Sequence, residues 1–285
     1  MKNILITGVS TGLGYHACSY LLNKGYRVLG SVRKQEDAQS LRDEFGPNFT
    51  PLVFDVTDTQ AVKAAIPVVR EVVGTEGLYA LVNNAGIAVS GPIKHVPLAR
   101  LETQLQVNVI ALVAVTQCFL PLLGGDRDSS FPPGRIINIS SVSGLIANPF
   151  MGPYAASKHA VEALSDVMRR EFNMYGIKVV CVEPGIIKTD IWQKAKSEPR
   201  NYGKTDYDDI LARQGKIIDG MESRGLPPVA VSRVIEKALT RKNPATRYIV
   251  ANKAWLYKLF AHIVPDKWLD SIIAKNISKD NIRSS

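Results

Sequence analysis

A tyrosine and a lysine stand four residues apart in the segment Tyr154-Ala155-Ala156-Ser157-Lys158. Side chains at this spacing lie on the same face of an α-helix. An ammonium group beside a phenol favours the phenolate and lowers the pKa of that phenol from its usual value of about 10. A tyrosine tuned in this way can give a proton to a developing alkoxide or accept one from an alcohol. The pair alone is weak evidence, because both residue types are common on helices.

A glycine-rich loop follows the first strand-like segment and precedes the first segment of helical spacing. Its glycines allow a tight turn, close approach of the backbone to a pyrophosphate and close packing of a helix on a sheet. The helix N-terminus adds free N–H groups and a partial positive charge that attract an anion. Any tight turn from a strand to a helix can look similar, but the position after the first strand favours a dinucleotide site. The loop residues are Thr7, Gly8, Val9, Ser10, Thr11, Gly12, Leu13 and Gly14.

The second strand-like segment ends at Val32-Arg33. A carboxylate at this point would hydrogen-bond the adenosine ribose hydroxyls and repel a 2′-phosphate, whereas an arginine favours that phosphate. Ser10 or Thr11 could add a hydroxyl contact. We therefore favour NADP over NAD, which stays possible. The alternative is that Arg33 is a solvated loop residue.

The order of the motifs resembles the short-chain dehydrogenase/reductase family. The glycine loop has the spacing G-x-x-x-G-x-G, Asn83-Asn84-Ala85-Gly86 follows a strand, and Ser141 precedes Tyr154 by 13 residues. Pro184-Gly185-Ile186-Ile187-Lys188-Thr189 is similar to the family element PGxxxT. The resemblance covers residues 2 to about 190 and part of 229–250. The stretch 143–149 and the pair Val182-Glu183 resemble the hydroxysteroid and retinol dehydrogenase branch.

This resemblance implies hydride transfer between a nicotinamide and a carbonyl or secondary alcohol. Tyr154 would be the acid and base, Lys158 would lower its pKa and hold the nicotinamide ribose, Ser141 would polarise the carbonyl, and Asn108 would support a water-mediated proton relay. The cofactor would supply the hydride, and the protein orientation and charge. The expected cofactor-binding residues are Gly8, Ser10, Thr11, Gly12, Leu13, Gly14, Arg33, Asp55, Val56, Asn83, Ala85, Gly86, Tyr154, Lys158, Pro184, Gly185, Ile187 and Thr189.

The substrate is less well defined than the chemistry. We expect a hydrophobic ketone or alcohol, such as a steroid, a retinoid or another lipid. The residues expected to contact it are Ser141, Leu145, Tyr154, Ile186 and Trp192, and Ile146, Phe150, Met151 and Ile187 could extend an apolar pocket. Core packing explains each of the apolar residues equally well. A 3-oxoacyl thioester reductase and a general carbonyl reductase are alternatives. A nucleotide-sensing protein without catalysis is also conceivable, but such proteins typically lose the tyrosine or the lysine.

Short apolar runs alternate along the chain with longer segments of helical period. Strands that are apolar throughout are typical of a sheet buried on both faces. Repetition of strand, helix and strand predicts right-handed crossovers. We therefore expect one α/β domain of the Rossmann type, a doubly wound parallel sheet of about seven strands with helices on both faces. The expected strands are 3–7, 27–32, 51–55, 79–83, 135–140, 178–183 and 247–250, and the expected helices are 13–24, 36–45, 59–74, 99–123, 153–175 and 229–240.

Residues 1–250 form the expected dinucleotide-binding and catalytic domain, in which the long insertion 189–228 is read as a substrate lid. Residues 251–285 form a basic, amphipathic extension. The net charge of the chain is +9, and residues 241–285 hold nine Lys and Arg against three Asp and Glu. This charge could mark an anionic partner. We favour a solvated face, or packing on the domain, the pocket or another subunit, over contact with a membrane surface. Nucleic acid is not expected.

Composition limits the other classes to which the protein could belong. The 285 residues are 46% hydrophobic and 21% charged, as in ordinary globular proteins. Cys18, Cys118 and Cys181 are far apart and the histidines lack ligand spacing, so neither a disulfide framework nor a metal site is expected. Strand-like residues begin directly after Met1, and the longest apolar run has seven residues. We therefore expect a cytoplasmic protein without a signal peptide or a membrane span. The family resemblance implies a homodimer or homotetramer.

Overall fold

The computed structural model describes residues 1–189, 203–212 and 225–277. Within these residues, seven strands form a single sheet in the order β3-β2-β1-β4-β5-β6-β7, and every neighbouring pair is parallel. The fold predicted from the sequence is therefore confirmed. The strands are β1 (Asn3–Ile6), β2 (Arg27–Val32), β3 (Phe49–Val53), β4 (Ala80–Asn83), β5 (Arg135–Ile139), β6 (Lys178–Pro184) and β7 (Arg247–Val250).

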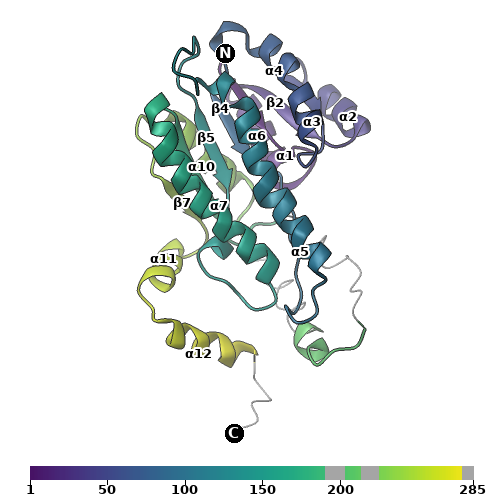
Figure 1. Ribbon diagram of the computed structural model, residues 1–285, viewed down its shortest axis with the longest axis vertical. Helices are drawn as coiled ribbons and strands as arrows, with labels where there is room; N and C mark the ends of the chain where they lie inside the picture. Colours follow the sequence, from purple (N-terminus) through teal and green to yellow (C-terminus); the bar gives the residue numbers. More distant parts are fainter. Residues whose placement is uncertain (190–202, 213–224, 278–285) are drawn as a thin grey trace.

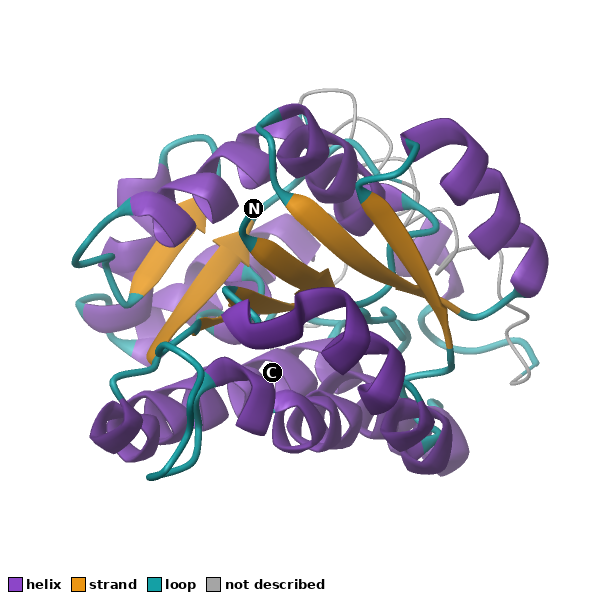
Figure 2. Ribbon diagram, turned by 90° about the horizontal axis from the view of Figure 1, so that it is seen from above, coloured by secondary structure: helices purple, strands orange, loops and turns teal. Residues whose placement is uncertain are grey.

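Helices cover both faces of the sheet (Figure 2). One face is covered by α1 (Gly12–Asn23), α2 (Gln35–Phe45) and α10 (Val229–Thr240). The other is covered by α3 (Thr59–Ala64), α4 (Ile66–Val73), α6 (Ala111–Phe119) and α7 (Gly152–Glu171). The helix α5 (Leu98–Leu105) precedes α6 along the same rod (Figure 1). These two layers bury the strands from both sides.

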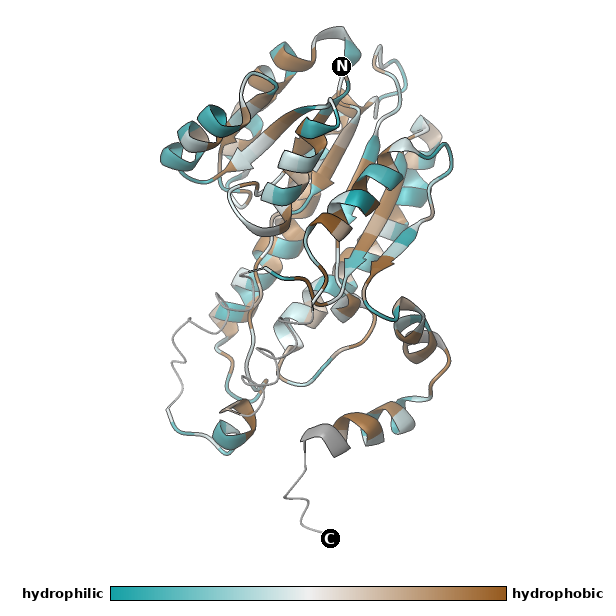
Figure 3. Cartoon of the chain, turned by 180° about the vertical axis from the view of Figure 1, so that it is seen from behind, coloured by the Kyte–Doolittle hydropathy of each residue, from teal (hydrophilic) through white to brown (hydrophobic). Residues whose placement is uncertain are grey.

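The strands supply apolar side chains to both layers in alternation. Ile4 and Ile6 of β1 belong to the core under α1 and α10, whereas Leu5 belongs to the core under α6 and α7. All three are fully buried. Because successive side chains of a strand point to opposite faces, a strand covered on both sides is apolar at most positions. The strands are accordingly mostly hydrophobic, with a few polar positions, in Figure 3.

The order of the strands places a crevice at their carboxyl ends. The strand β1 lies between β2 and β4, so the chain crosses from one side of β1 to the other between β3 and β4. The loops that follow β1 and β4 therefore diverge, and the space between them is where open α/β sheets bind ligands.

The predicted elements differ from the observed ones inside two helices and at the start of one strand. The predicted helix 59–74 is two helices joined at Ala65, next to Pro67. The predicted helix 99–123 contains a π-helical turn, Gln106–Ile110, between α5 and α6. The third strand begins at Phe49 rather than Pro51; proline is tolerated because β3 is an edge strand of the sheet.

The rod Leu98–Phe119 is the one described helix long and apolar enough to cross a membrane. Its α6 part packs on the sheet through Leu112, Val115 and Phe119, which are buried in the core. Packing in the core therefore accounts for part of its apolar character, whereas Leu98 and Ile110 are exposed.

Two further helices follow the last strand. They are α11 (Ala254–His262) and α12 (Asp266–Ile277). Figure 1 shows them extending from the end of β7 beyond the layers of the domain.

Gly14 in the first turn of α1 leaves no room for a side chain. A Cβ atom there would overlap the Gly8 carbonyl oxygen and the Asn84 side-chain nitrogen. We expect Gly14→Ala to lower the free energy of unfolding by about 1 to 3 kcal/mol, the usual cost of overpacking. Urea denaturation followed by circular dichroism measures this change. Gly203→Ala is the matched control, because nothing lies within 4 Å of a Cβ at Gly203; equal effects of the two substitutions would contradict the packing explanation.

Candidate active site

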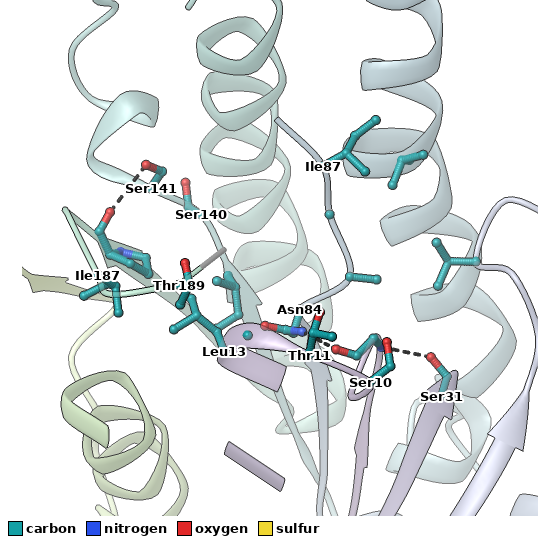
Figure 4. A pocket seen from close by; sticks show the side chains of 18 of the residues that line it. Ser10, Thr11, Leu13, Ser31, Asn84, Ile87, Ser140, Ser141, Ile187 and Thr189 are labelled. Carbon is teal, nitrogen blue, oxygen red and sulfur yellow. Dashed lines mark hydrogen bonds between the residues drawn. The ribbon is translucent and has the colours of Figure 1, made fainter. Parts of the chain in front are cut away.

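A cleft runs along the carboxyl ends of the strands. In Figure 4, Ser10, Thr11 and Ser31 lie at one end, and Ser140 and Ser141 lie at the other. The residues that line it are Gly8, Ser10, Thr11, Gly12, Leu13, Ser31, Val32, Arg33, Phe54, Asp55, Val56, Asn84, Ala85, Gly86, Ile87, Val107, Ile139, Ser140, Ser141, Tyr154, Lys158, Pro184, Gly185, Ile187 and Thr189.

The glycine-rich loop forms one end of the cleft. Gly8 and Gly12 have φ angles of 71° and 63°, which side chains rarely adopt. The Gly8 N–H donates to the Ser31 hydroxyl at 3.0 Å. Helix α1 begins at Gly12 with its first-turn N–H groups beside the cleft, and no acidic side chain lies in that turn. The loop therefore offers backbone donors and a positive helix end to a phosphate.

Asn84 joins this loop to the end of β4. Its side-chain nitrogen donates to the carbonyl oxygens of Thr7 at 2.9 Å and Gly8 at 3.0 Å. In return, the Thr7 hydroxyl accepts from the backbone N–H groups of Asn84 and Ala85, both at 3.0 Å. These four bonds fix the two loops on either side of the crevice. The sequence motif contained Asn84, but we did not include it among the expected site residues.

Arg33 and Asp55 lie along the same end of the cleft. Arg33 follows β2 and is exposed, so its guanidinium is accessible to a ligand. Asp55 lies two residues beyond the end of β3, and its carboxylate accepts from the N–H and hydroxyl groups of Thr57 at 2.8 and 2.7 Å. The carboxylate of Asp55 thus stabilises the turn formed by residues 55–57, and Asp55 also lines the cleft.

Tyr154, Lys158 and Ser141 meet at the other end. Tyr154 lies in the first turn of α7 and Lys158 one turn later, so both face the strand ends. The Lys158 ammonium donates to the Ile139 carbonyl oxygen at 2.8 Å and lies 5.7 Å from the centre of the Tyr154 ring. Tyr154 and Ser141 share a side-chain hydrogen bond. All three side chains are buried.

Burial dominates the protonation of this group. It raises the pKa of Tyr154 above its ordinary value, and the hydrogen bond with Ser141 opposes that shift. Burial also lowers the pKa of Lys158 to about 8, while Cys181 and Glu162 act in the opposite direction. This direction is opposite to the lowering that the lysine was expected to cause, because burial dominates the pKa of this phenol.

Asn108 lies in the π-helical turn rather than in the wall of the cleft. Its oxygen accepts from the Ile87 N–H at 2.9 Å, and its nitrogen donates to the Ile87 carbonyl at 3.0 Å and the Ser157 hydroxyl at 3.1 Å. The Ser157 hydroxyl in turn donates to the Tyr154 carbonyl oxygen at 2.7 Å. Asn108 thus connects the loop after β4 to the turn of α7 that carries Tyr154, and its role in a proton relay stays a prediction.

The other expected residues fall into three groups. Most of the expected cofactor residues line the cleft, but Gly14 is packed beneath the loop and Asn83 is buried in the sheet, where it donates to Asn138 and Thr116. Leu145 and Ile186 are partly buried but do not line the cleft. Trp192 and most of the expected lid lie outside the described residues.

The cleft is also lined by residues that the sequence did not indicate. They are Ser31, Val32, Phe54, Asn84, Ile87, Val107, Ile139 and Ser140.

The described part of the insertion meets two loops of the domain. Tyr207 packs edge-on against His95 and Phe150, with ring centres 5.9 and 5.7 Å apart. Lys94 forms an ion pair with Asp206 at 3.3 Å. Phe150 has a φ angle of 66°, which is unusual for a bulky residue. Sequence spacing gave no signal for His95 and Tyr207, because this aromatic contact joins residues far apart in the chain.

A buried ionic network lies directly behind the lysine. Glu162, one turn after Lys158, accepts from the Arg247 Nε at 2.9 Å and from the Cys181 thiol at 3.1 Å. Glu183, which is 1% exposed, lies 3.5 Å from the same Arg247 Nε. Glu162, Cys181 and Glu183 could together present ligand atoms to a metal ion. The guanidinium already supplies the positive charge that both carboxylates require.

Glu183 makes the stability of the fold depend on pH. Burial, and then the charge of Glu162, raises its pKa to about 7 against the lowering effects of Arg247 and Lys258. A group whose pKa is raised by folding stabilises the fold fully below its unfolded pKa of about 4.5, and this contribution is lost as the pH rises through 7.

We therefore expect the stability of the natural protein relative to a Glu183→Gln variant to fall between pH 4.5 and 7, by about 3 kcal/mol or less. Urea denaturation of both proteins across this range measures the difference. Glu171→Gln, on the exposed end of α7, controls for the loss of a charge. A difference between natural protein and Glu183→Gln that is constant with pH would contradict a raised pKa.

Comparison with known proteins agrees with this geometry. Residues 2–200 match the family model of the short chain dehydrogenases. An NADPH-dependent 3-dehydrocapnine reductase from Ornithobacterium rhinotracheale is 46% identical, and the alignment covers 98% of each chain. Retinol dehydrogenase 16 from Rattus norvegicus is 33% identical over 95% of this chain and 87% of the relative.

A solved structure of a short-chain dehydrogenase from Streptomyces avermitilis has the same fold, with a TM-score of 0.78 and 23% identity over 99% of this chain and 98% of the other. The family model covers more than half of the sequence, and the first relative aligns along nearly all of it. The chain therefore belongs to the short-chain dehydrogenase family and is an oxidoreductase of alcohol and carbonyl groups.

Proposed function

We propose that the protein is an NADP(H)-dependent reductase that converts a lipid-like ketone to a secondary alcohol. The observation that carries this proposal is the arrangement of the cleft. An anion-binding loop with Arg33 beside it forms one end, and Ser141, Tyr154 and Lys158 form the other. A dinucleotide lying between them would reach the hydroxyl pair with its nicotinamide end.

The residues at the phosphate end favour NADP. Arg33 is an exposed cation where an NAD-binding site usually has a carboxylate. Ser10, Thr11 and Ser31 place hydroxyl groups in the same part of the cleft. The relative from Ornithobacterium rhinotracheale is NADPH-dependent by name, which supports the same cofactor here.

The bound cofactor would supply the hydride, and the side chains would manage the proton. The hydrogen bond between Ser141 and Tyr154 allows both hydroxyl groups to contact one substrate oxygen. Because its pKa is raised, Tyr154 is protonated at neutral pH, the form required to donate a proton to the alkoxide formed in reduction. Lys158, with a pKa of about 8, is largely charged at pH 7 and stabilises the tyrosinate left behind.

The substrate end of the cleft favours an apolar ligand. Ile187 lines it, and Tyr207 packs against His95 and Phe150 where the insertion meets the domain. The relatives act on 3-dehydrocapnine and retinol by name. A 3-oxoacyl thioester and a small xenobiotic carbonyl compound are the alternatives.

A panel of ketones separates these candidates. NADPH oxidation is followed by absorbance with 3-dehydrocapnine, a steroid ketone, a 3-oxoacyl thioester and a small aromatic ketone. A kcat/KM highest for one of the lipid-like compounds supports the proposal, whereas a highest value for the thioester or for the small ketone contradicts the substrate class.

We further propose that the protein is a cytoplasmic homodimer whose subunits contact each other through the exposed face of the rod Leu98–Phe119. On this face Leu98 and Ile110 are 74% and 54% exposed. Such apolar surface is typical of subunit interfaces in soluble proteins.

Tyr154→Phe removes the hydroxyl and keeps the ring. We expect it to lower kcat by at least about 100-fold, the lower range for a general acid, while NADPH binding and the melting temperature change little. Stopped-flow absorbance and cofactor fluorescence measure these quantities. Tyr175→Phe, outside the cleft, is the control. Normal turnover in Tyr154→Phe would overturn the assignment of this tyrosine.

Arg33→Asp replaces the cation at the phosphate end by an anion. Hydrogen bonds to charged groups contribute about 1.5 to 3 kcal/mol, so we expect kcat/KM for NADPH to fall by about 10- to 100-fold, with no comparable loss for NADH. Steady-state kinetics with both cofactors measures the ratio. Lys34→Asp makes the same charge change at an exposed neighbour that does not line the cleft. An equal loss in both variants would indicate general electrostatics rather than a phosphate contact.

A further inference from the structure

The helices α11 and α12 expose large apolar side chains. Trp255 and Ile263 are 64% and 71% exposed, and Trp268 and Ile272 are 69% and 45% exposed. The chain has three tryptophans, and two of them lie on these helices with most of their surface accessible. Large exposed apolar groups that gather in one region mark sites of interaction.

These side chains lie on one face of each helix. In α11, Trp255, Leu259 and Ile263 follow one another at intervals of four residues, and in α12 Trp268 and Ile272 do the same. Leu256, Phe260, Leu269 and Ile273 are half-buried and lie beside these rows. Each helix therefore has a broad apolar face, which Figure 3 shows as hydrophobic stretches of both helices.

Positive charge accompanies the apolar faces. Lys253, Lys258 and Lys267 are exposed on or next to the two helices, against Asp266 and Asp270 on α12. Lysines outnumber aspartates among these five residues by one, so charge gives no attraction between two copies of this surface. The wider segment 241–285 has nine Lys and Arg against three Asp and Glu. A negatively charged surface would be attracted.

We propose that α11 and α12 form a lipid-binding surface that docks the protein on an anionic bilayer. Amphipathic helices with tryptophan and leucine on one face and lysine nearby lie in the plane of such interfaces. The exposure of both tryptophans differs from packing on the domain, which is one of the arrangements that the sequence favours alongside closure of the pocket and contact with another subunit. The binding itself does not depend on the catalytic activity.

The surface begins beside the catalytic end of the cleft. The Gly185 N–H donates to the Val250 carbonyl oxygen at 3.0 Å, and a Cβ at Gly185 would meet the Ala251 side chain at 2.7 Å. Gly185 lines the cleft, and α11 begins three residues after Ala251. A bilayer at this surface would therefore present lipids close to the catalytic residues, a consequence that rests on the proposed function.

Vesicle flotation tests the surface directly. The full chain is mixed with vesicles of phosphatidylglycerol and phosphatidylcholine in equal parts, or with phosphatidylcholine alone. We expect flotation with the anionic vesicles only, and its loss at high salt because surface charges are screened. We expect Trp255→Ala combined with Trp268→Ala to reduce the bound fraction by about ten-fold or more. Met174→Ala, which also removes a largely exposed apolar side chain, should float like the natural protein.

Two results would overturn the lipid-binding surface. One is absence of the natural protein from the anionic vesicles. The other is a tryptophan variant that still floats but loses an oligomer in analytical ultracentrifugation, which would make the surface an interface between copies. Turnover of a water-soluble ketone in the tryptophan variant tests whether the domain is intact. Failure of turnover in the natural protein, with flotation retained, would count against the proposed function and not against the lipid surface.

Discussion

The short hydrogen-bonded connection between Thr7 and Asn84 is the constraint on which the cleft depends. Parallel order alone only guarantees that the loops after β1 and β4 diverge. The amide of Asn84 holds two carbonyl oxygens of the glycine loop, and the Thr7 hydroxyl accepts two N–H groups in return. The first N–H groups of α1 have no partner within the helix because they lie at its start, and they can therefore bind a ligand. The lack of a side chain at Gly14 lets the helix approach closely enough for this arrangement.

The catalytic end of the cleft depends on buried side chains, whereas the cofactor end depends on backbone groups. Tyr154 and Lys158 are each 6% exposed, so both prefer their neutral forms more strongly than they would in water. The Ile139 carbonyl and the nearby carboxylate of Glu162 partly offset the cost of keeping the ammonium charged. A protonated phenol beside an amine that is still largely charged at pH 7 is well suited to a reaction that consumes a proton.

The sequence predicted the sheet and most of the cleft because both depend on local signals. Apolar runs marked the strands, and the glycine loop and the Tyr154–Lys158 spacing marked the two ends of the site. The π-helical turn at Asn108 and the contact of Tyr207 with Phe150 were not predictable, since both depend on residues distant in the chain. The pair Val182-Glu183 served only as a family resemblance, although a carboxylate in the buried part of β6 needs a charged partner such as Arg247.

Arg247 has a mechanical consequence. Its guanidinium contacts Glu162 and Asp166 on α7 and Glu183 on β6, and so joins the last strand to the helix that carries Tyr154 and Lys158. The chain continues from that strand directly into α11. These ion pairs therefore hold the strand that leads to the C-terminal helices against the helix whose backbone sets the position of the reactive phenol.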